Sequence, residues 1–318
     1  MSMEIVNSLI LFVIGFYILI RGAQFLVRGA VSVANIFKVS SWFVGVVVVG
    51  IGTSIPELSI NLASVFNGNN IGLATIIGSN TFNILVILGL SAIFMPIVIQ
   101  RDWFAKDFLL NVVAVMVAAI FILFPVLGPA DFNGIARAEG IVLFGLFIAW
   151  VFFMLSRRHT QEEGESYGAA TFLTASIMIV GGIIGVFLGG MWVVDGAQTI
   201  ATFFDIAPTL VGLTLVAIGT SLPELTVSLV ALYKKRLGIA VGNVIGSNIF
   251  DFLGILGITA LAKPIMVLES VQFDIFAALL ATLVLMVVSF TGKRFNITRR
   301  DGFVLILLYI AYITFLFM

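Results

Sequence analysis

The sequence predicts an all-α polytopic membrane protein with ten transmembrane helices in two inverted five-helix repeats. Three observations lead to this fold class. The composition is 61% hydrophobic and only 10% charged over 318 residues, which leaves too few polar side chains to cover the surface of a water-soluble domain. Apolar stretches of about 20 residues, the length that crosses a bilayer core as a helix, recur along the chain. A long motif also occurs twice, once in each half.

Ten apolar stretches separated by short polar breaks are predicted as membrane spans. Glycine and phenylalanine are abundant in them, as expected where helices pack closely in lipid and aromatic rings face the acyl chains. The predicted spans cover residues 5–30, 42–66, 71–95, 107–127, 138–156, 171–198, 208–232, 238–262, 272–290 and 301–317.

A hydrophilic segment near the midpoint divides the chain into a first repeat (1–156), a linker (157–169) and a second repeat (170–318). Val44–Leu58 reads VGVVVVGIGTSIPEL and Val211–Leu225 reads VGLTLVAIGTSLPEL. Downstream, Ile77–Asn83 (IGSNTFN) matches Ile245–Asp251 (IGSNIFD). Five spans end on the side opposite their start, so two such units in tandem are expected to be inverted relative to each other, as in many secondary transporters.

The distribution of basic residues predicts the orientation. With these spans, twelve of the sixteen Lys and Arg residues fall in loops on one side, the side of the linker. Positive loops face the cytoplasm, so we expect a cytoplasmic linker and both termini outside. The net charge of zero offers no basic stripe for nucleic acid. The absence of cysteine and the single histidine exclude disulfides and soft-metal sites.

Glu57, Glu224 and Asp251 lie inside predicted spans, where a carboxylate costs at least ~2.5 kcal/mol. Glu57 and Glu224 occupy matched positions of the repeat, and Asp251 matches Asn83. Duplication argues for function over a merely tolerated buried acid. Other polar residues accompany these acids: Thr53, Ser54 and Asn61 in the second span, Ser79, Asn80 and Asn83 in the third, Thr220, Ser221 and Ser228 in the seventh, and Ser247 and Asn248 in the eighth.

Pro56 and Pro223 follow Gly-Thr-Ser in both copies, and proline is expected to break the helix there and free backbone carbonyls. The carbonyls of Gly50 and Ala217 become candidate ligands. Carboxylate, amide, hydroxyl and carbonyl oxygens suit hard cations, with Ca²⁺ and Na⁺ fitting best.

Competition of the two ions for shared carboxylates would couple their fluxes, as in an exchanger, and no ATP-binding motif is present. A passive cation channel is one alternative. An intramembrane protease using Glu224 and Asp251 as an acid pair is another. The duplication of every acid-bearing motif argues against an enzyme, which needs one catalytic pair.

With these residues the sequence resembles the cation/Ca²⁺ exchanger superfamily, specifically the prokaryotic sodium/calcium exchangers. The resemblance rests on Gly52–Glu57 (GTSIPE) with Gly78–Asn83 (GSNTFN), and on Gly219–Glu224 (GTSLPE) with Gly246–Asp251 (GSNIFD). It implies alternating access, with the first and sixth spans as a sliding pair, in a cell (inner) membrane. The implied ligand set has Glu57, Asn83, Glu224 and Asp251 as the central ring, hydroxyl or carbonyl oxygens from Thr53, Ser54, Ser79, Thr220, Ser221 and Ser247, and carbonyls from Gly50 and Ala217.

The resemblance further implies transported Ca²⁺ and Na⁺ and no cofactor, and we expect the chain to function as a monomer in the lipid bilayer. Proton-coupled relatives typically carry a Gly-Asn pattern before the glutamate, so Gly-Thr-Ser-x-Pro favours sodium coupling over H⁺/Ca²⁺ exchange. Asp251 also resembles the K⁺-dependent branch, which leaves K⁺ dependence open.

Overall fold

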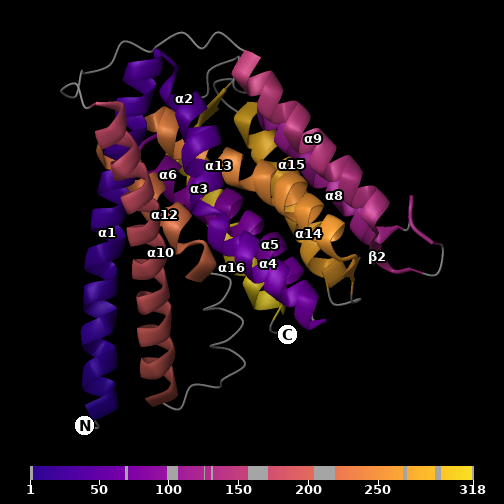
Figure 1. Ribbon diagram of the computed structural model, residues 1–318, viewed down its shortest axis with the longest axis horizontal. Helices are drawn as coiled ribbons and strands as arrows, with labels where there is room; N and C mark the ends of the chain where they lie inside the picture. Colours follow the sequence, from indigo (N-terminus) through magenta and orange to yellow (C-terminus); the bar gives the residue numbers. More distant parts are fainter. Residues whose placement is uncertain are drawn as a thin grey trace. The chain divides into compact units, whose positions relative to one another are not determined.

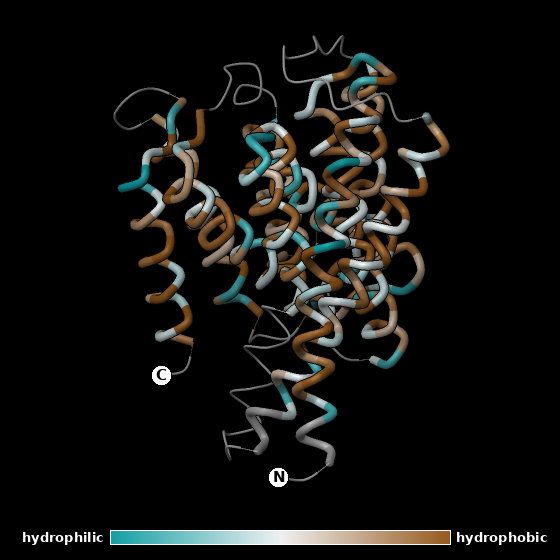
Figure 2. The backbone as a smooth tube through the Cα atoms, turned by 90° about the vertical axis from the view of Figure 1, so that its left-hand side faces the viewer, coloured by the Kyte–Doolittle hydropathy of each residue, from teal (hydrophilic) through white to brown (hydrophobic). Residues whose placement is uncertain are grey.

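The computed structural model describes residues 3–68, 71–98, 107–124, 126–129, 132–156, 171–203, 219–267, 271–290 and 295–316. Within these ranges the chain is almost entirely helical, and hydrophobic residues predominate along the helices (Figure 1, Figure 2). Seven helical stretches of the described residues are long and apolar enough to cross a membrane, and two shorter apolar helices, Leu109–Leu123 and Leu222–Tyr233, accompany them.

The first half of the sequence forms eight α-helices and two short strands within the described ranges. They are α1 (Met3–Phe37), α2 (Ser41–Val44), α3 (Ile51–Thr53), α4 (Ile55–Asn67), α5 (Ile71–Phe82), α6 (Leu88–Phe94), β1 (Ile97–Val98), α8 (Leu109–Leu123), β2 (Gly134–Ile135) and α9 (Arg137–Ser156), with π-helical stretches at Gly45–Gly50 and Asn83–Ile87.

The second half repeats this order. It contains α10 (Phe172–Phe203), α12 (Leu222–Tyr233), α13 (Leu237–Ile249), a π-helical stretch (Phe250–Ile255), α14 (Leu256–Ala262), β3 (Ile265–Met266), α15 (Val271–Phe290), β4 (Asn296–Ile297) and α16 (Arg299–Leu316).

Where the structure describes their residues, the predicted spans lie mostly on helices, although α8 ends at Leu123, before the predicted end of span 107–127. The linker 157–169 and the first part of span 208–232, Ala217 included, lie outside the described residues. Two helices continue well past the predicted ends of their spans: α10 reaches Phe203, five residues beyond, and α1 reaches Phe37, seven residues beyond. No proline lies between Ala30 and Lys38, and the helix ends only before Lys38, which has a left-handed φ of 54°.

The chain forms two compact units, and each takes segments from both halves of the sequence. The first comprises Met1–Thr53 and His159–Asn243, and the second Ser54–Arg158 and Val244–Met318.

In the first unit, α1 and α10 pack antiparallel through glycines spaced seven residues apart. Gly15, Gly22 and Gly29 lie on α1, and Gly182, Gly189 and Gly196 on α10. A Cβ atom added at Gly22 would lie 2.6 Å from the backbone nitrogen of Val186. Only glycine therefore permits this backbone-to-backbone approach, the usual way for helices to associate tightly in lipid.

In the second unit, α6 packs against α16 and α9 against α14. The strands follow the same scheme, since β1 pairs antiparallel with β4 and β2 with β3. Gly134 in β2 has a φ of 149°, and a side chain there would collide with the carbonyl oxygen of Ile265. Strand β1, which follows the third span, thus pairs with β4, which precedes the tenth. Their repeat counterparts pair in the same way, since β3 follows the eighth span and β2 precedes the fifth.

Candidate cation site

The second unit contains a buried polar cluster around Asp251, which is 1% exposed. The Asn80 side-chain amide donates to Asp251 Oδ2 at 2.8 Å and also to the Ile76 carbonyl at 2.7 Å. The Ser54 and Ser79 hydroxyls lie beside the same carboxylate. Three predicted site residues therefore meet within this unit: Ser54 at the N-cap of α4, Ser79 on α5, and Asp251 in the eighth span.

A second buried hydrogen bond in this unit joins Asn83 and Asn248. The Asn83 side-chain nitrogen donates to Asn248 Oδ1 at 3.0 Å. In the repeat, Asn80 corresponds to Asn248 and Asn83 to Asp251, both separated by 168 positions. Each bond thus joins the first of these two repeat positions in one half of the chain to the second position in the other half. The two bonds differ only in that one contains Asp251 where the other contains Asn83.

Three oxygens of these pairs have no hydrogen-bond partner among the described residues. They are the Oδ1 atoms of Asn80, Asn83 and Asp251. Buried polar atoms are nearly always paired, because an unpaired one costs the desolvation of that group. Three such oxygens in one buried region fit a site that donates oxygens to a cation.

The backbone departs from regular α-helix at the same places. A π-helical stretch begins at Asn83 in the third span, and Asp251 is the second residue of the corresponding stretch in the eighth. π-Helical turns change the hydrogen-bond register and often occur at functional sites. The repeated distortion places both ligand candidates where the local backbone is irregular.

Glu57 lies in the first turn of α4 and is 2% exposed. The helix breaks at Ser54, and Pro56 occupies the first turn, so the break predicted from the Gly-Thr-Ser-x-Pro sequence is present. A carboxylate at a helix N-terminus is favoured by the helix dipole. Asn61, one turn further, is completely buried, and neither of its amide atoms has a hydrogen-bond partner among the described residues.

The first unit carries the corresponding residues of the second repeat. Glu224 lies in the first turn of α12, is 1% exposed, and follows a break at Ser221 with Pro223 beside it. Ser221 is fully buried, whereas Thr220 is partly exposed. The Glu224 position thus repeats the Glu57 position in backbone conformation.

Asn243 connects the polar residues of the first unit. Its side-chain nitrogen donates to the Glu224 carbonyl at 3.1 Å and to Ser228 Oγ at 3.0 Å, while its Oδ1 lies 3.1 Å from the donor hydroxyl of Thr53. Thr53 Oγ1 is also 3.3 Å from the Gly50 carbonyl. This amide therefore ties Thr53 of the first repeat to the Glu224 turn of the second.

Asn243 was not among the predicted site residues, although the sequence contains a signal for it. Asn243, Ser247 and Asp251 are spaced four residues apart, and Thr75, Ser79 and Asn83 show the same spacing in the first repeat. Residues at i and i+4 share a helix face. Extending the polar stripe by one turn would have found Asn243.

Within neither unit do three acidic or imidazole side chains of the described residues gather into a metal site. The predicted residues divide between the units, with Gly50, Thr53, Thr220, Ser221 and Glu224 in the first and Ser54, Glu57, Ser79, Asn83, Ser247 and Asp251 in the second. Ala217 lies outside the described residues.

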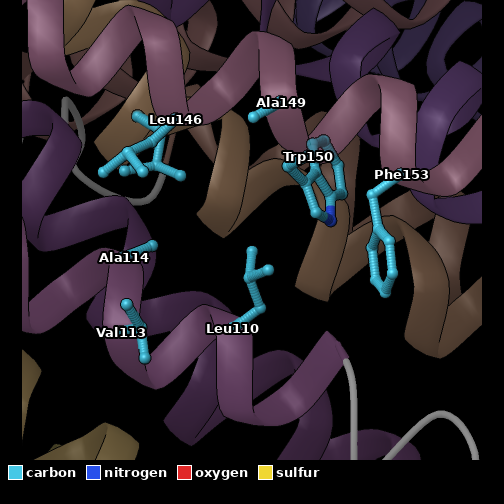
Figure 3. Close-up of a pocket in the computed structure, with 8 residues that line it drawn as sticks. Leu110, Val113, Ala114, Leu146, Ala149, Trp150 and Phe153 are labelled. Carbon is cyan, nitrogen blue, oxygen red and sulfur yellow. The ribbon is translucent and has the colours of Figure 1, made fainter.

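A pocket of about 310 Å³ in the second unit is unsuited to a cation. Figure 3 shows that apolar side chains of α8 and α9 line it, with the Trp150 indole as the one polar-edged group. The lining residues are Leu110, Val113, Ala114, Leu146, Ala149, Trp150, Phe153 and Leu253.

Multiple apolar helices with duplicated buried acids and amides define a multi-pass membrane transporter. The chain belongs to the sodium/calcium exchanger family: the profile of the family described as "Sodium/calcium exchanger protein" matches residues 7–156 and 174–318. This membership confirms the family resemblance and the helical polytopic fold class. The family consists of transporters, so the expectation that the chain is not an enzyme is also confirmed.

Individual relatives cover nearly the whole chain. An uncharacterized membrane protein of Methanocaldococcus jannaschii is 35% identical over 94% of both chains. The sodium/calcium exchanger MaX1 of Methanosarcina acetivorans is 29% identical over 98% of this chain and 99% of its own. A solved structure of the sodium-calcium exchanger NCX_Mj superimposes with a TM-score of 0.82 at 32% identity, covering 98% of this chain and 99% of that one.

Proposed function

We propose that this protein exchanges Na⁺ for Ca²⁺ across the membrane by alternating access, with both ions competing for one set of oxygen ligands. The relatives named sodium/calcium exchangers support this proposal. The observation that carries it is the reciprocal pair of buried bonds, Asn80–Asp251 and Asn83–Asn248, with their unpartnered Oδ1 atoms. A carboxylate and neutral amides offer both divalent and monovalent ions hard ligands without the full repulsion of several anions.

The proposed ligand set is that of the sequence analysis, with Glu57, Asn83, Glu224 and Asp251 at the centre. Thr53, Ser54, Ser79, Thr220, Ser221 and Ser247 supply further oxygens, and Gly50 and Ala217 supply carbonyls. Burial of Glu57, Glu224 and Asp251 to 2% exposure or less supports this assignment. One chain provides every member of the set, which favours function as a monomer.

The reciprocal pairing within the second unit supports the inverted repeats 1–156 and 170–318. When an element of the first repeat pairs with an element of the second, the equivalent elements of the opposite repeats pair as well. A two-fold symmetry axis between the repeats requires this. Strands β1–β4 and β2–β3 follow this rule, as do α6–α16 and α9–α14.

The test is ⁴⁵Ca²⁺ uptake into proteoliposomes loaded with Na⁺, compared with K⁺-loaded, choline-loaded and acid-interior vesicles. Uptake is expected only with internal Na⁺. Uptake driven by the proton gradient would assign H⁺/Ca²⁺ exchange, and a requirement for K⁺ alongside Na⁺ would assign the K⁺-dependent branch. Uptake without any counter-ion gradient would identify a channel and refute the proposal.

Single substitutions test the ligand set. Glu57→Gln and Glu224→Gln each remove one negative charge with little change of shape, and Na⁺-driven uptake should be abolished in both. Asp195→Asn is the matched control, because Asp195 is an exposed acid on α10. Control-like uptake by either glutamate variant would remove that residue from the site.

We also propose a cytoplasmic linker and external termini in a cell (inner) membrane, on the strength of the basic residues on the linker side. The chain contains no cysteine, so a single introduced cysteine reports its own side. Thr160→Cys should be protected from a membrane-impermeant maleimide in whole cells, and Ser2→Cys should be labelled. The reverse pattern would contradict this orientation.

A further inference from the structure

Two basic side chains lie side by side in the first unit, away from the buried acids. Lys234 directly follows the last residue of α12, and its Nζ donates to the backbone carbonyl of Gln24 on α1 at 3.2 Å. Arg28 lies one turn further along α1. The Lys234 ammonium is thus held against α1 next to a second cation.

These two charges lack an acidic partner among the described residues. Burial and the neighbouring Arg28 charge lower the pKa of Lys234 to about 8. An acid in contact would act in the opposite direction, because an opposite charge favours the protonated ammonium. Two cations that repel each other in a fixed geometry are a ready-made site for an anion.

The surroundings indicate an anion that belongs to the membrane surface. Arg21, on the same face of α1, donates from Nη1 to the side-chain oxygen of Gln24 at 3.2 Å, and both arginines are exposed. Tyr233, next to Lys234, is 89% exposed. Exposed tyrosine beside basic residues is typical of the depth at which lipid headgroups lie.

We propose that Arg28 and Lys234 bind the phosphate of an anionic phospholipid headgroup at the junction of α1 and α12. The planar guanidinium can hold two phosphate oxygens, while the ammonium acts as a compact charge on the third. Arg21 extends the basic face along α1. The same chemistry would accept a free phosphate ion, so the experiment distinguishes the two sources.

The test measures the thermal stability of the purified full-length chain in a neutral detergent, titrated with short-chain phosphatidylglycerol, phosphatidylcholine or inorganic phosphate. Phosphatidylglycerol should stabilise the protein at concentrations where phosphatidylcholine does not. Arg28→Gln and Lys234→Gln should each weaken the apparent phosphatidylglycerol affinity about fivefold, the contribution of one basic residue near an anionic surface. Arg299→Gln, which removes an exposed charge in the second unit, should leave it unchanged.

Equal phosphatidylglycerol affinity in all variants would overturn the site. Stabilisation by inorganic phosphate as strong as that by phosphatidylglycerol would overturn the lipid assignment. If Arg28→Gln does not fold, Arg28→Lys keeps the charge and removes only the fork of donors. The affinity of Arg28→Lys should then lie between those of the wild type and Lys234→Gln, and wild-type affinity would contradict two-point binding by Arg28. None of these readouts depends on ion transport.

Discussion

The contact between α1 and α10 can be tested at two neighbouring glycines of α10. A Cβ atom added at Gly182 would lie 2.6 Å from the backbone nitrogen and 2.8 Å from the Cα of Leu26 on α1. At Gly181, the preceding residue, a Cβ atom meets no heavy atom within 4 Å. Gly182→Ala and Gly181→Ala therefore make the same chemical change at a position that contacts α1 and at a position in open space.

The expected difference follows from the atoms that would collide. Non-bonded carbon atoms pack at about 3.5–4.0 Å, so α1 and α10 would have to separate by about 1 Å near Gly182, because the obstacle is backbone and cannot rotate away. Overpacking of this kind costs about 1–3 kcal/mol. Both variants replace glycine by alanine within a helix, which is worth about 1 kcal/mol. The propensity change is common to both, so their difference isolates the steric cost of about 1–3 kcal/mol.

The assay is thermal unfolding of the two purified full-length variants in the same detergent, followed by loss of the monodisperse peak in size-exclusion chromatography. Gly181→Ala should unfold at or above the wild-type temperature and Gly182→Ala several degrees below Gly181→Ala. Equal unfolding temperatures would mean that the helices separate without cost, and the tight glycine contact would then not stabilise the protein.

Three further predictions concern other buried or basic groups. Glu139→Ala should lower the free energy of unfolding by at least about 2 kcal/mol, because three backbone N–H groups that donate to the Glu139 carboxylate would lose their partner. Denaturant titration measures the loss, and Glu139→Gln, which keeps one acceptor oxygen, is the comparison. Asn80→Asp should reduce Na⁺-driven Ca²⁺ uptake at least about tenfold, because a donor 2.8 Å from Asp251 becomes a like charge, and unchanged uptake would contradict that role. The free energy of unfolding should rise between pH 8 and pH 10.5. The lowered pKa of Lys234 means that the unfolded chain binds more protons than the folded chain in this range. Denaturant titration across this pH range measures the rise, which Lys234→Gln should remove.

Hydropathy predicted the positions of the helices, and the prolines predicted the helix breaks. Spans end where apolar residues end, as α15 does at Phe290, because bilayer thickness sets the length of each apolar run. The break at Ser54 follows from Pro56, which cannot continue the hydrogen bonds of the preceding turn. Both signals are local, so a single sequence contains them.

The packing partners could not be predicted in the same way. Every span is apolar, so hydropathy does not indicate that α1 packs with α10 or α6 with α16. The seven-residue spacing of Gly15, Gly22 and Gly29 was visible in the sequence, but a glycine stripe does not name its partner. The four-residue polar spacing indicates Asn243, but it does not indicate that its side chain bonds to Thr53 and to the Glu224 carbonyl, which lie on other segments of the chain.

The exchange of Asn for Asp at one position of the repeat gives the two copies different properties. A carboxylate can only accept hydrogen bonds, so Asp251 requires Asn80 to point its NH₂ group toward it and to leave its own oxygen facing elsewhere. Asn83 and Asn248 are both amides, and either can rotate to become the donor. The copy that contains Asp251 is therefore fixed in orientation when this carboxyl group is ionised, whereas the copy with two amides can present either an oxygen or an N–H group. If Asn83 is a ligand as proposed, an oxygen turned toward the cation would favour binding and an N–H group would disfavour it, so amide rotation at Asn83 would weaken ion binding without moving a helix.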